Sequence, residues 1–128
     1  WGLIDQLPPE NGFIWSFYEP DIRFVGTPVI AWDHVYIASK EGRLFALDKA
    51  TGRKIWDFHI EGEFNGSPSV AHQSVLVGGV DGKIHSVDAF TGEKQWDIHV
   101  GNSISATPVV ANGVLYVSSH DGALYAFR

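Results

Sequence analysis

The stretch ALDKATGRKIW, residues 46–56, decides the fold because a close copy, SVDAFTGEKQW, occupies residues 86–96. Both share the pattern small-x-Asp-x-x-Thr-Gly-x-x-x-Trp, and their tryptophans lie 40 positions apart. A pattern copied at fixed spacing indicates a repeat architecture, in which each copy supplies one structural unit. The residues of the shared pattern are Ala46, Asp48, Thr51, Gly52 and Trp56 in the first copy, and Ser86, Asp88, Thr91, Gly92 and Trp96 in the second.

The repeat extends well beyond these eleven residues. Segment 27–66 aligns without a gap on segment 67–106, and the pattern restarts at residue 107. Pro28, Pro68 and Pro108 fall at equivalent positions, as do Gly42, Gly82 and Gly122. We therefore divide the chain into an N-terminal extension (1–11) and a region of repeats (12–128), made of a lone outer strand (12–26), two full units (27–66 and 67–106) and a partial unit (107–128).

Each full unit predicts four short strands, which in the first unit lie at about 28–31, 35–39, 44–47 and 54–60. The last of these alternates apolar and polar residues at period two, and Glu41-Gly42 predicts a hairpin turn. No segment has helical periodicity. Four strands in about 40 residues are typical of one blade of a β-propeller, so the sequence predicts an all-β propeller of four-stranded antiparallel blades.

The two ends of the repeat region complement each other. Residues 12–17 resemble 52–58, with Trp15 in the place of Trp56 and one residue fewer after the glycine. They predict a lone fourth strand, and the partial unit 107–128 supplies strands one to three. The chain thus holds three blade-equivalents, fewer than the four to eight of typical propellers. Two explanations remain open: the chain is part of a larger propeller of seven or eight blades, or identical copies assemble and each N-terminal strand completes a partner's blade.

The composition limits the class of protein. A chain of 128 residues with 45% hydrophobic residues suits one packed domain. The net charge of −6 repels phosphate backbones, which argues against nucleic-acid binding. No apolar run is long enough for a membrane-spanning helix. The lack of cysteine excludes disulfides and fits a periplasmic or extracytoplasmic location, and Trp1 in place of Met suggests processing or a longer parent chain.

The repeated pattern resembles the tryptophan-docking motif of quinoprotein-type propellers, over about residues 12–127. This superfamily includes pyrroloquinoline-quinone (PQQ) dependent alcohol dehydrogenases and non-catalytic binding or scaffold proteins. The resemblance implies that each motif tryptophan docks between neighbouring blades, and we assign that structural role to all ten motif residues and Trp15. Ser86 is a mild departure, because the family has alanine there.

The same resemblance implies what an active dehydrogenase needs: a catalytic aspartate, a calcium site of Glu, Asn and Asp, and often a pair of neighbouring cysteines. The chain has no cysteine, and no converging set of calcium ligands is evident. We therefore expect no catalytic residue, no metal site and no cofactor, and a module that binds or scaffolds protein partners. The alternative is a fragment of a PQQ-dependent dehydrogenase whose active-site residues lie elsewhere, with PQQ and Ca²⁺ as cofactors.

Other candidate sites have simpler explanations in the repeat. His59 and His99 are predicted to be exposed on outer strands, and His85 to pack between blades. Ser118-Ser119-His120-Asp121 holds triad residue types, but it occupies a turn position of the repeat. Trp1, Leu3, Ile4 and Leu7 could pack on the propeller or dock a partner.

Overall fold

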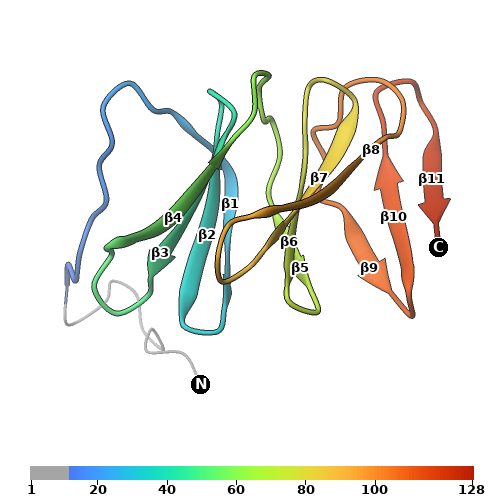
Figure 1. Ribbon diagram of the computed structural model, residues 1–128. Helices are drawn as coiled ribbons and strands as arrows, with labels where there is room; N and C mark the ends of the chain where they lie inside the picture. The colour runs from blue at the N-terminus through green and yellow to red at the C-terminus, as the bar shows by residue number, and fades with distance from the viewer. Residues whose placement is uncertain (1–11) are drawn as a thin grey trace.

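The computed structural model describes residues 12–128, which form eleven β-strands and no helix (Figure 1). The strands are β1 (Phe24–Ala31), β2 (His34–Ser39), β3 (Arg43–Asp48), β4 (Lys54–His59), β5 (Ser69–Ala71), β6 (Ser74–Gly78), β7 (Lys83–Asp88), β8 (Lys94–His99), β9 (Val109–Ala111), β10 (Val114–Ser118) and β11 (Leu124–Phe127). Within the described part, no helix could span a membrane.

The strands form three antiparallel sheets that stand side by side, in the order of the sequence (Figure 1). The first sheet has the order β1-β2-β3-β4 and the second β5-β6-β7-β8, so each is a simple meander of one full repeat. The third sheet contains β9, β10 and β11. This arrangement confirms the predicted all-β fold of propeller blades.

The first strand departs from the prediction in length. Strand β1 begins at Phe24, inside the range 12–26 that the sequence assigned to a lone outer strand. Its pairing with β2 shifts register between Val25 and Val29, and Gly26 lies in this irregular stretch with a φ of +72°. A glycine tolerates this conformation, so the strand continues through a bulge that a strict alternation pattern does not reveal.

Residues 12–19 have no strand assignment, although the sequence predicted a strand over 12–17. A β-strand needs a neighbouring strand with which it forms backbone hydrogen bonds, and among the described residues no strand pairs with this segment. Its side chains nevertheless pack against the first sheet, as described below. The extension 1–11, with the apolar patch predicted there, lies outside the described residues.

The main apolar core lies between the first and second sheets. From the first sheet Tyr36, Leu44 and Trp56 pack in one cluster with Val75 and Val87 of the second sheet. A second cluster joins the second and third sheets; its buried members are Leu76, Ile84, Val100, Ile104, Leu115 and Val117. Because neighbouring blades cover both faces of the inner strands, residues 44–47 and 84–87 are buried without interruption, including the polar His85 and Ser86.

We predict that Trp56→Ala lowers the free energy of unfolding by about 3–5 kcal/mol, because it removes a large ring that is only 9% exposed in this core. Urea denaturation followed by circular dichroism measures the change. Ile55→Ala, at the neighbouring exposed position of β4, should cost less than about 1 kcal/mol. Equal losses for the two variants would contradict this packing role.

Candidate functional site

The Asp-x-x-Thr-Gly segment folds as a compact turn in both full blades. In the second blade Asp88 Oδ1 accepts hydrogen bonds from the backbone N–H groups of Phe90 (2.8 Å) and Thr91 (3.0 Å). The N–H of Gly92 donates to the Asp88 carbonyl at 2.9 Å, and Gly92 has a φ of +76°. The aspartate thus works as an Asx-turn acceptor, and glycine provides the left-handed conformation that ends the turn.

Each turn receives the tryptophan of the preceding outer segment. Trp56 Nε1 donates to the carbonyl of Ala89 at 3.0 Å, and a Cβ added at Gly92 would lie 2.6 Å from the indole. One repeat earlier, Trp15 Nε1 donates to the carbonyl of Lys49 at 2.8 Å, and its ring occupies the space of a Cβ at Gly52. The two contacts use equivalent residues of the repeat for the indole, for the carbonyl that accepts its N–H, and for the glycine under its ring. We call this arrangement, an indole stacked on a turn glycine with its N–H on a turn carbonyl, the docking contact.

A tyrosine strengthens the docking contact of the second blade. The Tyr36 hydroxyl donates to the same Ala89 carbonyl at 2.9 Å and also lies 3.0 Å from His34 Nδ1. Burial, together with the nearby negative charge of Asp88, raises the pKa of Tyr36 to about 12, so the hydroxyl stays a donor. Sequence reasoning missed this residue, because Leu76 replaces the tyrosine in the next repeat and hides its polar role.

The position of Ser86 explains its departure from the family's alanine. Its side chain is fully buried, and its hydroxyl donates to Gln95 Oε1 at 2.8 Å. The hydroxyl of Ser74 donates to the same oxygen at 2.7 Å. Ala46 has no such partner in the first blade, because Ile55 takes the place of Gln95. The serine is therefore satisfied by a local change in the next strand.

Trp96 differs from its two equivalents. It is 40% exposed, and within the described residues its indole N–H has no hydrogen-bond acceptor and its ring has no turn glycine to cover. It lines an apolar cavity of about 520 Å³ between the second and third sheets, together with Leu76, Ile98, Val110, Leu115 and Phe127. At the equivalent position of the first blade, Trp56 is covered by the turn that contains Gly92.

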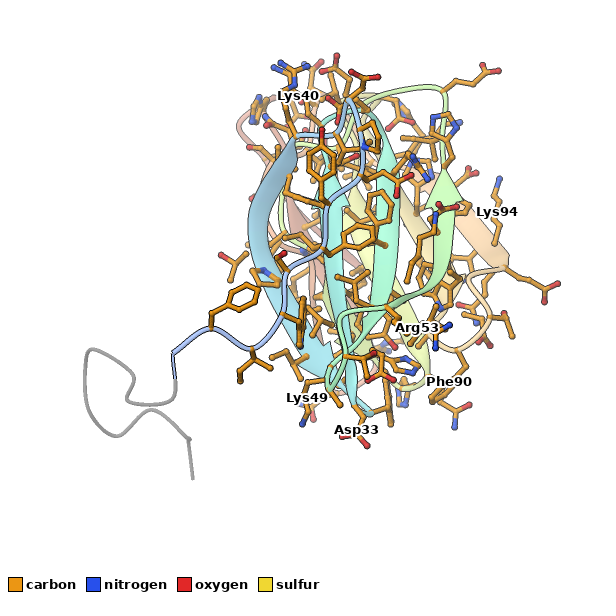
Figure 2. All side chains as sticks on the ribbon, turned by 90° about the vertical axis from the view of Figure 1, so that its left-hand side faces the viewer. Asp33, Lys40, Lys49, Arg53, Phe90 and Lys94 are labelled. Carbon is orange, nitrogen blue, oxygen red and sulfur yellow. The ribbon has the colours of Figure 1, made fainter. Side chains whose placement is uncertain are left out.

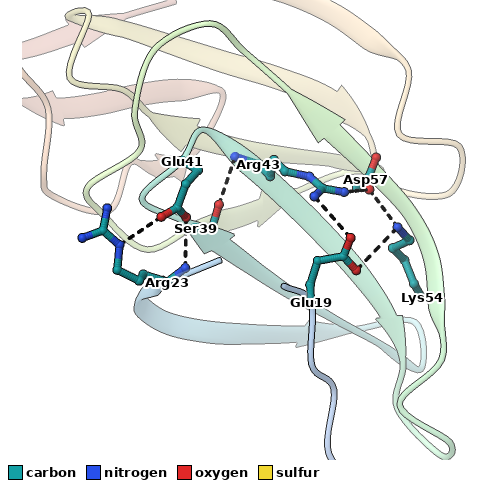
Figure 3. A network of polar contacts seen from close by, with 7 residues as sticks. All are labelled: Glu19, Arg23, Ser39, Glu41, Arg43, Lys54 and Asp57. Atoms are coloured by element: carbon teal, nitrogen blue, oxygen red, sulfur yellow. Dashed lines mark hydrogen bonds and ion pairs between the residues drawn. The ribbon is translucent and has the colours of Figure 1, made fainter. Parts of the chain in front are cut away.

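Ion pairs repeat along the outer strands. Asp57 pairs with Arg43 and with Lys54, and Glu19 from the N-terminal segment joins the same network on Arg43 at 3.3 Å (Figure 3). Partial burial raises the pKa of Asp57, but the hydrogen bonds and charges of Lys54 and Arg43 outweigh it and hold the pKa below its ordinary value. The network ties residues 12–23 to the first blade.

The described acidic residues do not fit the calcium ligand set that an active quinoprotein needs. Nowhere in residues 12–128 do three or more His, Cys, Asp or Glu side chains gather as a metal site. A calcium ion takes six to eight oxygens, whereas these carboxylates accept hydrogen bonds from their own turns or form ion pairs. The carboxylates concerned are Asp48, Asp57, Asp81, Asp88, Asp97 and Asp121.

The remaining candidate residues also have structural partners. His120 Nε2 lies 2.7 Å from Ser105, while the Ser119 hydroxyl donates to the carbonyl of Asn102, so the Ser-His-Asp stretch does not form a triad. His85 is buried beside Phe58 and Phe64, as the alignment predicted. The two histidines that were predicted on outer strands, His59 and His99, are exposed as expected.

One exposed aromatic pair does not follow the repeat. Trp32 lies in the β1–β2 turn and Phe90 in the Asp88 turn, and their ring centroids are 5.3 Å apart. Both are 41% exposed. Figure 2 shows Phe90 at the same end of the molecule as Asp33 and Lys49, which form an ion pair of 3.5 Å. We call Trp32, Asp33, His34, Lys49 and Phe90 the turn-end patch.

The turn that carries Trp32 is unfavourable for this residue. Trp32 and Asp33 have φ values of +51° and +61°, as in a type I′ hairpin turn. The equivalent turn of the third sheet is Asn112-Gly113, the residue pair that this turn prefers. A bulky aromatic residue at a position suited to Asn is a local cost, and such costs are frequent at functional surfaces.

We predict that stability is greatest above about pH 4.5 and falls as the pH drops towards 2. Hydrogen bonds from the Arg23 backbone N–H and guanidinium lower the pKa of Glu41 from 4.5 to about 2. The unfolded chain therefore takes up this proton first, which favours unfolding in acid. Lowered pKa values act in the same direction at Asp57, Asp88, Asp97 and Asp121.

Melting temperatures measured between pH 7 and pH 2.5 test this expectation. Glu41→Gln should lose less stability over the acid range than the wild type, because one of the contributing carboxylates is gone. Glu61→Gln, at an exposed position, is the matched control and should follow the wild-type curve. Parallel acid curves for Glu41→Gln and the wild type would contradict the role of the Arg23–Glu41 contacts.

Comparisons with known proteins agree with this geometry. A family model described as outer membrane protein assembly factor BamB matches residues 12–101 and again residues 73–128. The crystal structure of BamB from Moraxella catarrhalis is 33% identical, with a TM-score of 0.71 over 78% of this chain and 32% of that chain. The chain thus spans about a third of that protein's length. Comparison with curated proteins gave no match.

Two dehydrogenase structures share the fold. Quinohemoprotein alcohol dehydrogenase from Comamonas testosteroni is 22% identical, with a TM-score of 0.72 over 83% of this chain and 19% of that chain. A europium-containing methanol dehydrogenase is 20% identical, with a TM-score of 0.75 over 88% of this chain and 24% of that chain. Because the two matches of the family model together cover the whole repeat region, the chain belongs to the BamB family of PQQ-type β-propeller repeats.

Proposed function

We propose that this chain is a non-catalytic propeller module that binds protein partners through the turn-end patch, and that it works in an extracytoplasmic compartment. The observation that carries the proposal is the Trp32–Phe90 pair, two exposed aromatic rings that the repeat does not require. Aromatic side chains in contact at a surface are frequent anchors of protein interfaces. The lack of cysteine in the sequence and the family resemblance support the location.

Two features of the patch favour a protein partner over a small molecule. The rings come from different blades, so the turns of β1–β2 and β7–β8 offer one continuous surface. His34 extends the aromatic surface, with its ring centroid 5.9 Å from that of Phe90, and the Asp33–Lys49 ion pair borders it. An apolar centre with a charged rim is the usual composition of a binding surface for protein.

The family description supplies the class of partner to test. It names an assembly factor for outer membrane proteins, and we propose that unfolded outer-membrane β-barrel chains are recognised by the turn-end patch. The strands of such chains alternate apolar and polar residues and carry aromatic residues near their ends, and these apolar and aromatic side chains suit contacts with Trp32 and Phe90. The alternative, a fragment of a PQQ-dependent dehydrogenase, has the likeness of the fold as its support, and fold alone does not define activity.

The test measures binding of a fluorescently labelled, urea-unfolded outer-membrane β-barrel protein by anisotropy after dilution. We expect saturable binding by the wild type and an affinity at least about tenfold weaker for Trp32→Asn and Phe90→Ala. Both variants should keep the fold, because Asn112 and Ala50 are the residues of the repeat at these positions. Val80→Lys, at the opposite end of the blades, has the lysine of position 40 as its model and should bind normally.

A parallel titration with PQQ in the presence of Ca²⁺, followed by absorbance, separates the two classes. Stoichiometric tight binding of PQQ would overturn the proposal in favour of the dehydrogenase fragment. A wild-type chain that does not bind the unfolded barrel protein, or variants that bind as well as the wild type, would also overturn it.

A further inference from the structure

The two ring nitrogens of His34, in the turn-end patch, have different surroundings. The Nδ1 atom lies 3.0 Å from the oxygen of the Tyr36 hydroxyl. The Nε2 atom has no hydrogen-bond partner in residues 12–128. The buried side-chain polar atoms without a partner in this range are Ser69 Oγ and His85 Nδ1, so His34 Nε2 is open to solvent.

The hydrogen bonds of Tyr36 assign the proton of the imidazole. The Tyr36 hydroxyl lies 2.9 Å from the carbonyl oxygen of Ala89, which can only accept. Burial raises the pKa of Tyr36 to about 12, so the hydroxyl keeps its single proton at neutral pH and gives it to this carbonyl. If the hydroxyl gave its proton to Nδ1 instead, its oxygen would face the carbonyl with no hydrogen between them. The network therefore places the proton of neutral His34 on Nδ1 and a lone pair on Nε2.

The same chain of hydrogen bonds fixes the imidazole beside an exposed aromatic ring. The Ala89 carbonyl also accepts from Trp56 Nε1 at 3.0 Å, so the chain of hydrogen bonds ends in the buried docking contact. Phe90 follows Ala89 directly, and its ring centroid lies 5.9 Å from that of His34 in an edge-to-face arrangement. The lone pair of His34 is thus held at a fixed position next to Phe90.

We propose that His34 Nε2 accepts a hydrogen bond from a backbone N–H group of the chain that binds the turn-end patch, an inference that rests on the function proposed above. A folded domain pairs nearly all of its backbone N–H groups, whereas an unfolded chain leaves them available. A fixed acceptor beside two aromatic rings therefore selects unpaired, extended chain. The side chains of such a segment contact Trp32 and Phe90 while its backbone donates to His34.

This contact makes binding depend on pH. Histidine is the side chain that ordinarily changes charge between pH 8 and pH 6, whereas carboxylates and lysines titrate outside this range. When His34 takes up a second proton, Nδ1 still donates to Tyr36, but Nε2 becomes a donor and can no longer accept. The contact with the partner is then lost, while the ring keeps its place. The charged groups around His34 and Tyr36 are Asp33 and Lys49 of the patch, Asp48 opposite His34 in β3, and Asp88 near Tyr36.

Nitrogen-15 NMR of the histidine side chains tests the position of the proton without any partner. At pH 8 the correlations between ring protons and ring nitrogens should identify His34 as the form protonated on Nδ1. The signal is assigned by its absence in His34→Gln. A neutral His34 that carries its proton on Nε2 would overturn the inference, because no lone pair would then face the partner.

Anisotropy titrations at pH 8 and pH 6, with the same labelled and urea-unfolded barrel protein, test the contact itself. We expect the wild type to bind about three- to tenfold more weakly at pH 6, as for the loss of one hydrogen bond. His34→Asn reaches only the position of Nδ1, so it should bind about three- to tenfold more weakly than the wild type at both pH values.

His34→Gln places an amide near the position of Nε2, where its oxygen can accept but does not titrate. It should bind more tightly than His34→Asn at pH 8, and its affinity should not change at pH 6. Both variants should fold with native circular dichroism, because Ser74 and Val114 occupy the equivalent positions of the other repeats.

His72→Asn is the matched control. His72 is exposed in the β5–β6 turn, and Asn112 is its equivalent in the third repeat, so this variant should keep the wild-type change between pH 8 and pH 6. A wild type with the same affinity at both pH values, or equal binding by His34→Gln and His34→Asn, would overturn the inference and leave the proposed function in place. A wild type that does not bind at pH 8 would overturn the proposed function, and the inference with it.

Discussion

The stacking of an indole on the turn glycine of the next blade is the contact on which the rest of the structure depends. A single four-stranded blade has two apolar faces and cannot cover either by itself. The docking contact fixes the distance and orientation between blades by two means. The ring of Trp56 fills the space over Gly92, and its N–H binds the Ala89 carbonyl, which also accepts from Tyr36. The repeated motif is therefore explained as packing chemistry rather than as a ligand site.

The polar groups of the repeat also stabilise the turns and the contacts between strands. The aspartate of each turn accepts backbone N–H bonds, and hydrogen bonds from Phe90 and Thr91 lower the pKa of Asp88. Each outer-strand aspartate pairs with a basic residue of the neighbouring strand and with a lysine of its own strand. An active quinoprotein would instead have to leave several carboxylates free to converge on a calcium ion. The carboxylates of the described residues thus hold turns and blades together, and the binding function that we propose depends on the exposed Trp32–Phe90 pair.

The fold could be predicted from the sequence because the same pattern of strand and turn residues recurs in each repeat. The gapless 40-residue alignment defines the strands, and the shared Asp, Gly and Trp positions define the turns. The same alignment shows what the repeats share, so it does not reveal contacts that only one repeat makes. The hydrogen bond of Tyr36, the Ser86–Gln95 pair and the Trp32–Phe90 contact each need residues that one repeat has and another lacks. The motif also could not predict the exposure of Trp96, because that exposure depends on which segment lies beside β11.

A double-mutant cycle on Trp56 and Gly92 tests the docking contact most directly. Gly92→Ala should destabilise the wild type through both its positive φ and the collision of the new Cβ with the indole. In the Trp56→Ala background the collision disappears and the backbone cost remains, so we expect the two losses to be non-additive by at least about 0.5 kcal/mol. Losses that add to within about 0.3 kcal/mol would contradict the account, because they would mean that the indole does not rest on the turn glycine.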